Sequence, residues 1–162
     1  MEIRINQAEQ GQLTHSLEIK GIPVKTGETP DGIICSIGAV LDVKLSPEDL
    51  DEVERKRPRG EDPRPPAMVV RFVRQTVRDE VIRLRKVKRD FTTRHLGWDS
   101  DQWIYIGEEI TPVNRHLYWL ARQVKAAGRL RYVWFARGIR CRREDGQPVV
   151  IINTAEDLEA FH

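Results

Sequence analysis

Hydrophobic and polar positions along the chain predict a succession of strands and helices. The segment from Ser16 to Ile22 alternates apolar and charged side chains, which is typical of a half-buried strand, and residues 67–73 predict the strongest strand of the chain. Apolar side chains recur at helical spacing in residues 32–41 and again in residues 75–89. Residues 51–57 indicate an exposed strand, and residues 103–106 a short one.

The order strand, helix, strand, strand, helix, strand predicts a ferredoxin-like (βαββαβ) domain over residues 15–107. In such a domain the helices lie on one face of an antiparallel sheet, and the other face is free for a ligand. Residues 1–14 are polar and predict an N-terminal arm or short helix, for which the end of a coiled coil is one interpretation.

Residues 108–162 predict a second, smaller α+β domain. Thr111 is a good N-cap, Pro112 is tolerated at the first helical position, and Gly128 ends the helix. Turn sequences then separate three predicted strands, and Thr154 caps a last short helix. The three strands and the last helix are expected at residues 131–135, 139–143, 148–152 and 155–161. The fold class is therefore α+β throughout.

Charge is distributed unevenly between the two halves. Residues 1–62 carry 8 basic and 13 acidic residues, whereas residues 63–162 carry 19 basic and 12 acidic ones. Between Pro112 and Arg143 there are nine basic residues, five aromatic residues and no acid. An arginine-rich block of one sign, interleaved with aromatics, favours a polyanion whose bases can stack. The alternative interpretation is a solvated basic face that binds nothing.

Several short motifs carry a family resemblance. The segments 17–23 and 68–73, each followed by a helix, resemble the atypical RNA-recognition-motif (RRM) domain of the first-open-reading-frame protein of LINE-type non-LTR retrotransposons. The segments 104–106, 111–115, 131–138, 142–146 and 156–158 resemble the C-terminal domain of the same family, a pattern that also occurs in baculovirus few-polyhedra (FP) proteins. Together they cover residues 15–161.

The resemblance implies a protein that binds single-stranded nucleic acid, mainly RNA, in a basic cleft between two domains. It also implies a nucleic-acid chaperone that coats its transcript in a ribonucleoprotein and self-associates through an N-terminal coiled coil. By this resemblance Arg115 and Arg131 fall on RNA-contacting positions of the C-terminal domain, and Arg85, Lys86 and Arg89 lie near the basic end of the second RRM helix. The zinc knuckle of some relatives is absent.

Other candidate contacts come from residue pattern alone. Arg71 on a central strand either contacts phosphate on the open sheet or pairs with Glu18 or Glu54. Arg78 shares a helix stripe with Arg85 and Arg89, and that stripe is either an RNA contact or a solvated face. Further candidates lie in the basic block: Arg122, Lys125, Arg137 and Arg140.

Aromatic residues are expected to serve packing more than binding. An ordinary RRM places aromatics on its two central strands, and here those strands hold only Phe72. Tyr132 and Trp134 share one strand face, and we expect that face to pack on the helix beginning at Thr111. The other tryptophans are likewise expected in the core or between domains. Binding should then run through arginine and phosphate, with little sequence preference.

Enzymatic and membrane functions find no support in the sequence. The chain has no phosphate-binding glycine loop, no nucleophile elbow and no histidine or cysteine pair at ligand spacing, so we expect no catalysis, cofactor or metal. It has no apolar run long enough for a membrane span and no signal peptide, and its two cysteines are expected to be reduced. We expect an intracellular protein of the cytoplasm or nucleus.

Two functions remain open from sequence. The first is a non-enzymatic protein that binds single-stranded RNA, or single-stranded DNA, through phosphate contacts. The second is a viral or domesticated FP-like module in which the basic face meets an acidic protein partner or serves assembly.

Overall fold

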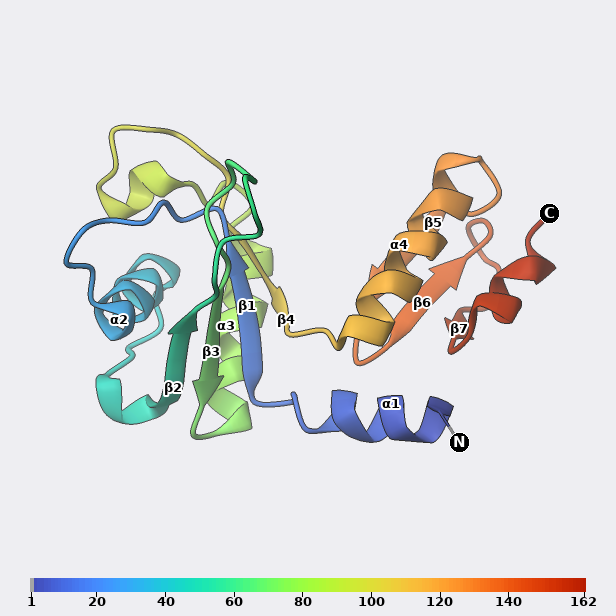
Figure 1. Ribbon diagram of the computed structural model, residues 1–162, viewed down its shortest axis with the longest axis horizontal. Helices are drawn as coiled ribbons and strands as arrows, with labels where there is room; N and C mark the ends of the chain where they lie inside the picture. The colour runs from blue at the N-terminus through green and yellow to red at the C-terminus, as the bar shows by residue number, and fades with distance from the viewer. Residues whose placement is uncertain (1) are drawn as a thin grey trace. The chain divides into compact units, whose positions relative to one another are not determined.

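The computed structural model describes residues 2–162, which form two compact units. The central unit is His15–Glu109, and the terminal unit combines residues 2–14 with Ile110–His162. Both units mix helices with an antiparallel sheet, so the predicted α+β class is confirmed (Figure 1). Each unit is described below by itself.

The central unit has the predicted ferredoxin-like topology. Its strands lie side by side in the order β2-β3-β1-β4, and every pairing is antiparallel (Figure 1). Two helices follow β1 and β3 along the chain, which gives the βαββαβ sequence of elements. The elements are β1 (Ser16–Lys20), α2 (Pro30–Leu41), β2 (Leu50–Arg55), β3 (Met68–Phe72), α3 (Gln75–Val87) and β4 (Tyr105–Glu108), with short 3-10 turns at Pro47–Asp49 and Thr93–Leu96.

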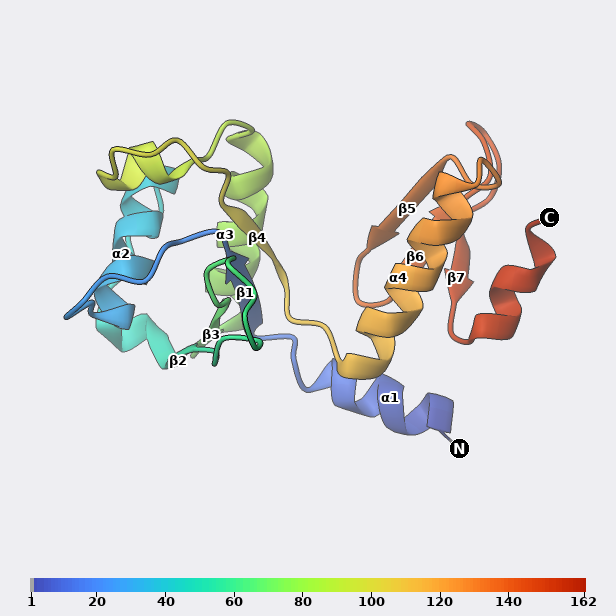
Figure 2. The same cartoon turned by 45° about the horizontal axis from the view of Figure 1, so that its top comes forward.

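Alternation along the central strands builds the core of this unit. Leu17 and Ile19 of β1 and Val70 of β3 are almost completely buried, and they pack with Ile37 of α2 and Val81 of α3. Both helices therefore cover the same face of the sheet (Figure 2). The fourth strand forms two residues later than predicted, because Trp103 makes only an isolated bridge to Thr92 before regular pairing with β1 begins.

Gly21 allows the chain to leave β1 in a tight turn. Its φ of 100° is a conformation that side chains rarely adopt, and a Cβ atom there would collide with the carbonyl oxygen of Trp103. A glycine is therefore required where the chain turns away from the sheet beside β4.

The terminal unit packs a helix on a three-stranded sheet of order β5-β6-β7 (Figure 1). Leu117 and Ala121 of the helix meet Ile139 and Cys141 of the central strand, and Leu158 closes the core. The three strands confirm the sequence prediction, and the predicted last short helix forms as a 3-10 helix capped by Thr154. The elements are α1 (Glu2–Gly11), α4 (Pro112–Ala126), β5 (Tyr132–Phe135), β6 (Ile139–Arg142), β7 (Val150–Ile152) and η3 (Ala155–Ala160).

Helix α1 is joined to the start of α4 by buried amide and hydroxyl groups. The Asn6 amide donates to Asn114 Oδ1 at 2.9 Å, and the Thr111 hydroxyl donates to Asn6 Oδ1 at 2.7 Å. The Gln10 side-chain oxygen accepts from the backbone N–H of Thr111 at 3.0 Å and from the Asn114 amide at 3.1 Å. Four polar side chains thus satisfy one another where α4 begins, as buried polar groups must.

Candidate nucleic-acid interface

The basic face of α4 results from the way this helix is anchored. The Thr111 side chain accepts a hydrogen bond from the Asn114 backbone N–H at 3.1 Å, so the predicted N-cap is confirmed. Leu117 and Ala121 then turn one stripe of the helix into the core. Because the basic side chains of the helix recur on a different stripe, Arg122 and Lys125 are left exposed to solvent, and Arg129, just after the helix ends, is exposed as well.

These three cations have few partners within the protein. The Arg122 guanidinium lies over the Tyr118 ring, 4.6 Å from its centroid, which is a favourable cation–π distance. In the part of the chain that the structure describes, no acidic group forms an ion pair with Arg122, Lys125 or Arg129. Arg115, in the first turn of α4, is half-buried. The exposed face therefore carries positive charge that is not locally neutralised.

Arg131 is already engaged at the start of β5. Its guanidinium is 3.1 Å from Asp145 Oδ2 and lies 5.5 Å from the centroid of the Tyr132 ring. The same carboxylate accepts a hydrogen bond from the Tyr132 hydroxyl, and this bond raises the pKa of Tyr132 above its usual value. A polyanion that approached Arg131 would have to compete with the carboxylate of Asp145. Arg131 is therefore a weaker phosphate contact than an unpaired arginine would be.

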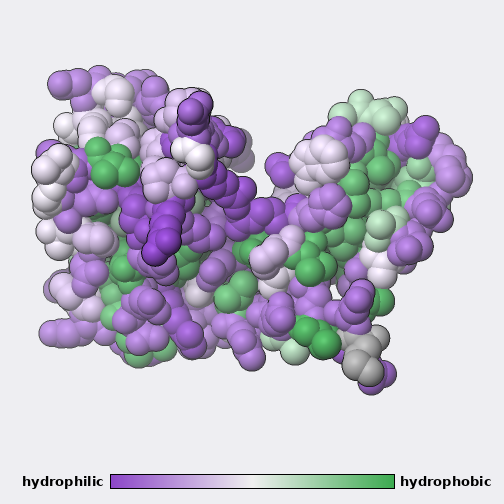
Figure 3. All heavy atoms as spheres, viewed as in Figure 1, coloured by the Kyte–Doolittle hydropathy of each residue, from purple (hydrophilic) through white to green (hydrophobic). Residues whose placement is uncertain are grey.

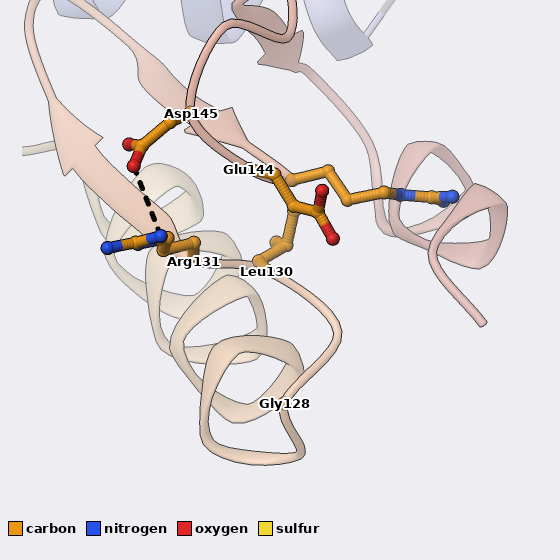
Figure 4. A pocket seen from close by; sticks show the side chains of 6 residues that line it. Gly128, Leu130, Arg131, Glu144 and Asp145 are labelled. Carbon is orange, nitrogen blue, oxygen red and sulfur yellow. Dashed lines mark ion pairs between the residues drawn. The ribbon is translucent and has the colours of Figure 1, made fainter.

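A polar pocket of about 420 Å³ lies beside this ion pair (Figure 4). It is lined by Gly128, Leu130, Arg131, Arg143, Glu144 and Asp145. Arg143 donates to the Ala160 carbonyl at 2.9 Å and stacks over the Phe161 ring, so it fastens the C-terminal 3-10 helix. Two basic and two acidic residues line this pocket together, which leaves little net charge to attract a phosphate.

The remaining candidates of the terminal unit lie around the turn between β5 and β6. Arg137 occupies that turn with a positive φ of 59°, and it is exposed. Arg140 is half-buried on β6, and its Nε donates to the Ala136 carbonyl at 3.0 Å. Arg137 thus adds an exposed cation at the turn between β5 and β6, while Arg140 lies on the sheet face opposite α4.

In the central unit, the open face of the sheet does not resemble a binding platform for RNA. Arg71 is exposed on β3, as predicted, but it lies 3.5 Å from Asp51 instead of pairing with Glu18 or Glu54. Register places Glu52 and Glu54 of β2 and Glu18 of β1 on the same face as Arg71. Hydrophilic residues predominate over the central unit in the view of Figure 3, and Phe72 is buried on the opposite face of the sheet from Arg71. Glu18 is buried and paired with Lys20 and Lys56, but the exposed carboxylates of Glu52 and Glu54 would repel a phosphate backbone.

Helix α3 divides its basic residues between structure and solvent. Arg78 is buried and forms ion pairs with Glu108 and Asp79, both at 2.9 Å. Because these ion pairs hold the guanidinium inside the unit, Arg78 has a structural role and does not offer the phosphate contact that was expected. Arg85 is half-buried, and its Nε has no hydrogen-bond partner, whereas Lys86 and Arg89 are exposed near the end of the helix.

Tyr132 and Trp134 of β5 do not pack on α4, contrary to the expectation from sequence. Val133 and Phe135 pack on the core, so the alternating positions of β5, Tyr132 and Trp134, lie on the opposite face of the sheet. Trp103 and Trp119 are also outside the core, with 53% and 50% of their surface exposed. The alternation of β5 in the sequence contained this signal, but Val133 and Phe135 are apolar as well, so hydrophobicity alone did not identify the inner face.

The described residues offer neither a metal-binding cluster nor a membrane-spanning helix. No group of three or more histidine, cysteine, aspartate or glutamate side chains among residues 2–162 is arranged to hold a metal ion. Cys35 and Cys141 are free thiols, and burial raises the pKa of both. Among the described helices, none combines the length and apolar character needed to cross a bilayer.

Comparison with known families concerns the terminal unit. Residues 111–162 match the family model of baculovirus FP protein domain 2. The match begins at the N-cap of α4 and includes the three strands and the last 3-10 helix. The FP-like part of the resemblance predicted from sequence is thereby confirmed for this segment. Comparison with curated proteins finds no match.

Proposed function

We propose that this protein binds single-stranded nucleic acid, mainly RNA, without catalysing a reaction. The observation that carries the proposal is the exposed row Arg122, Lys125 and Arg129 on one face of the FP-like domain. A phosphate backbone that binds there releases its condensed counterions, and this release is the main source of affinity for a basic protein surface. A nucleic-acid chaperone of retrotransposon type, coating RNA in a ribonucleoprotein, is the biological role that this chemistry supports.

The contrast between two helices of the same chain supports this proposal over a merely solvated face. On α3, Arg78 pairs with Glu108 and Arg83 pairs with Glu80, so these cations are matched by acids. Arg122 and Lys125 share one face of α4, and Arg129 follows the end of that helix; in the described chain none of them pairs with an acid, which costs self-repulsion in the free protein. An anionic ligand removes that repulsion.

The path of the strand should avoid the open sheet of the central unit. The exposed Glu52 and Glu54 make that sheet unfavourable for phosphate, unlike the sheet of an ordinary RRM. The central unit would instead contribute Lys86 and Arg89 from the end of α3, with Arg71 and Arg85 as weaker candidates. The cleft between domains implied by the family resemblance stays a prediction.

A second candidate function follows from the FP match. In an FP-like interaction module, the basic face of α4 would bind an acidic protein segment or serve assembly. An acidic peptide and an RNA strand would then compete for the same cations. The two functions differ in the ligand preferred: a nucleic-acid-binding protein prefers RNA to polyglutamate of equal charge, and an interaction module shows the reverse order.

The decisive experiment measures RNA affinity of an Arg122→Ala/Lys125→Ala double variant by fluorescence anisotropy at several salt concentrations. Each lost phosphate contact should reduce the slope of log affinity against log salt by about 0.7, so two contacts should reduce it by about 1.4. Affinity should fall for every RNA sequence, because phosphates carry no sequence information.

The matched control is an Arg64→Ala/Arg83→Ala double variant. It removes the same charge, but Arg64 is bound to Asp62 at 2.7 Å and Arg83 to Glu80 at 2.6 Å. Its slope should equal that of the wild type. Equal slopes for both double variants, with both proteins folded, would remove α4 from the interface and with it the proposed function.

A further inference from the structure

The sheet of the terminal unit has a face that its core does not use. Because Ile139, Cys141 and Ile152 face α4, the alternate residues of the three strands face the other way. Register places Trp134 opposite Arg140, and Arg140 opposite Ile151, in one row across the sheet. Tyr132 and Arg142 face each other in a second row. Two aromatic rings, two guanidinium groups and one aliphatic side chain thus share one surface.

Part of this surface is open to solvent. Tyr132 exposes 37% of its surface and Ile151 exposes 49%. The two arginines are half-buried. Arg140 is held by its bond to the Ala136 carbonyl, and the Nε of Arg142 is buried without a hydrogen-bond partner. Because Arg140 is already held, a ligand that contacts it costs little further side-chain entropy.

The charge of the face determines what kind of partner can cover it. Within the described residues, neither Arg140 nor Arg142 forms an ion pair. An apolar protein surface laid on this sheet would bury two uncompensated guanidinium groups, which is costly. A ligand that combines flat apolar rings with nearby negative charge satisfies the aromatic and the cationic groups together, because arginine itself stacks on flat rings.

Spacing along β5 selects for a strand with separated bases. Tyr132 and Trp134 are two residues apart, which corresponds to roughly 6.7 Å along a β-strand. Bases stacked on one another follow at about 3.4 Å along each strand of a duplex, so two neighbouring bases cannot both reach these rings while they remain stacked. An unpaired strand can separate its bases to do so.

We propose that Trp134, Tyr132, Arg140 and Arg142 form a platform on which unpaired bases of an RNA strand stack. This inference rests on the proposed function and adds to it. The bases occupy the sheet face opposite α4, and the phosphates that belong to them lie near Arg140 and Arg142 on the same face. The platform accounts for a preference for single strands, which phosphate contacts alone do not provide.

The test compares two RNA strands of equal length, oligouridine and an abasic strand that carries the same phosphates without bases. The wild type should bind oligouridine more tightly than the abasic strand. Trp134→Leu should weaken oligouridine binding about tenfold, within the range for loss of one stacked base, and leave abasic binding unchanged. Trp134→Phe, which retains a ring, should recover most of the affinity for oligouridine.

Controls keep the outcome interpretable. Trp134 lies outside the core cluster, so all variants should keep the circular dichroism and melting temperature of the wild type. Trp103→Leu removes an equally apolar, exposed ring from the central unit and should bind both strands as the wild type does.

Three results would overturn the platform. Equal wild-type affinity for both strands, together with no effect of Trp134→Leu, removes base stacking and leaves the phosphate-binding proposal standing. Absence of binding to either strand removes both proposals. Tighter binding of polyglutamate than of oligouridine, lost in Trp134→Leu, would assign the face to an acidic protein.

Discussion

At the scale of single residues, the arginines differ by what surrounds their guanidinium groups. Arg55 is the most fully bonded of those described: it contacts both Glu28 carboxylate oxygens, at 3.1 and 2.9 Å, and donates to the carbonyls of Ile22 and Pro66 at 2.7 and 2.9 Å. It ties the loop after β1 to β2 and to the segment before β3. Its charge serves the fold, whereas that of Arg122 remains available for a ligand.

The pairing with Arg55 makes the stability of the central unit depend on pH. Hydrogen bonds from Arg55 lower the pKa of Glu28 below its usual 4.5 in the folded protein. A depressed carboxyl pKa stabilises the fold above about pH 4.5, and that stabilisation is lost as pH falls through the folded value. Glu28→Gln should therefore reduce the free energy of unfolding at neutral pH, and its difference from the wild type should shrink in acid.

Urea titrations from pH 7 down to pH 3 measure this effect. Glu48→Gln, which alters an exposed carboxylate in the turn before β2, is the matched control and should show a small difference from the wild type. Arg55→Met should cost about 3 kcal/mol at neutral pH, because it leaves a largely buried carboxylate without its partner. A difference between Glu28→Gln and the wild type that grows toward low pH would contradict the assigned pairing.

Residue roles were the least predictable part of the sequence. Helical periodicity places Arg78, Arg85 and Arg89 on one stripe, but it cannot place Glu108, which lies 30 positions after Arg78 and buries its guanidinium. The position of Trp134 was not predictable either, because both faces of β5 carry apolar side chains and the pattern cannot show which face packs on the core. Arg122 and Lys125 are exposed because the apolar stripe of α4 turns a different face of the helix to the core; their contact with nucleic acid stays a prediction.

At the scale of elements, the hydrophobic pattern and the turn-forming residues predicted most of the helices and strands. The N-cap at Thr111 and the alternation of residues 16–20 are local features, and local features determine helix starts and strands. The contact between α1 and α4 was not predicted, because Asn6 and Gln10 are polar and their buried partners lie more than 100 positions away.

The hydrogen-bonded contact of α1 with α4 leads to a prediction about coupling. Asn6→Ala and Asn114→Ala each remove one partner from a buried network, so each should lower stability by about 1–3 kcal/mol. Because the two side chains bond directly, the double variant should cost less than the sum of the single variants.

Hydrogen exchange of α1 amides, measured with urea unfolding, provides the readout. Both single variants should increase exchange throughout α1, while Glu9→Ala on its exposed face should not. Strict additivity of the Asn6 and Asn114 effects would show that the contact does not contribute to folding. Self-association through α1, expected from the family resemblance, stays a prediction that the same variants can address by sedimentation.

At the scale of the whole molecule, uneven charge is the feature most relevant to function. The chain has a formal net charge of only +2, yet its acids concentrate in residues 1–62 and its acid-free basic block lies in residues 112–143. Such a molecule presents a local basic surface without a large total charge. Association with a polyanion should therefore depend on where the charge lies more than on its sum.

This distribution predicts the salt dependence of RNA binding. If about five phosphates are contacted, log affinity should fall against log salt with a slope near −3 to −4 for a single strand, since each contact contributes about 0.7. The slope should be the same for RNA strands of different sequence, because it counts phosphates. A titration of single-stranded RNA, single-stranded DNA and duplex DNA at rising salt measures it directly. A slope near zero would mean that the affinity does not arise from ion release. The basic face of α4 would then not be a binding surface for a nucleic-acid backbone.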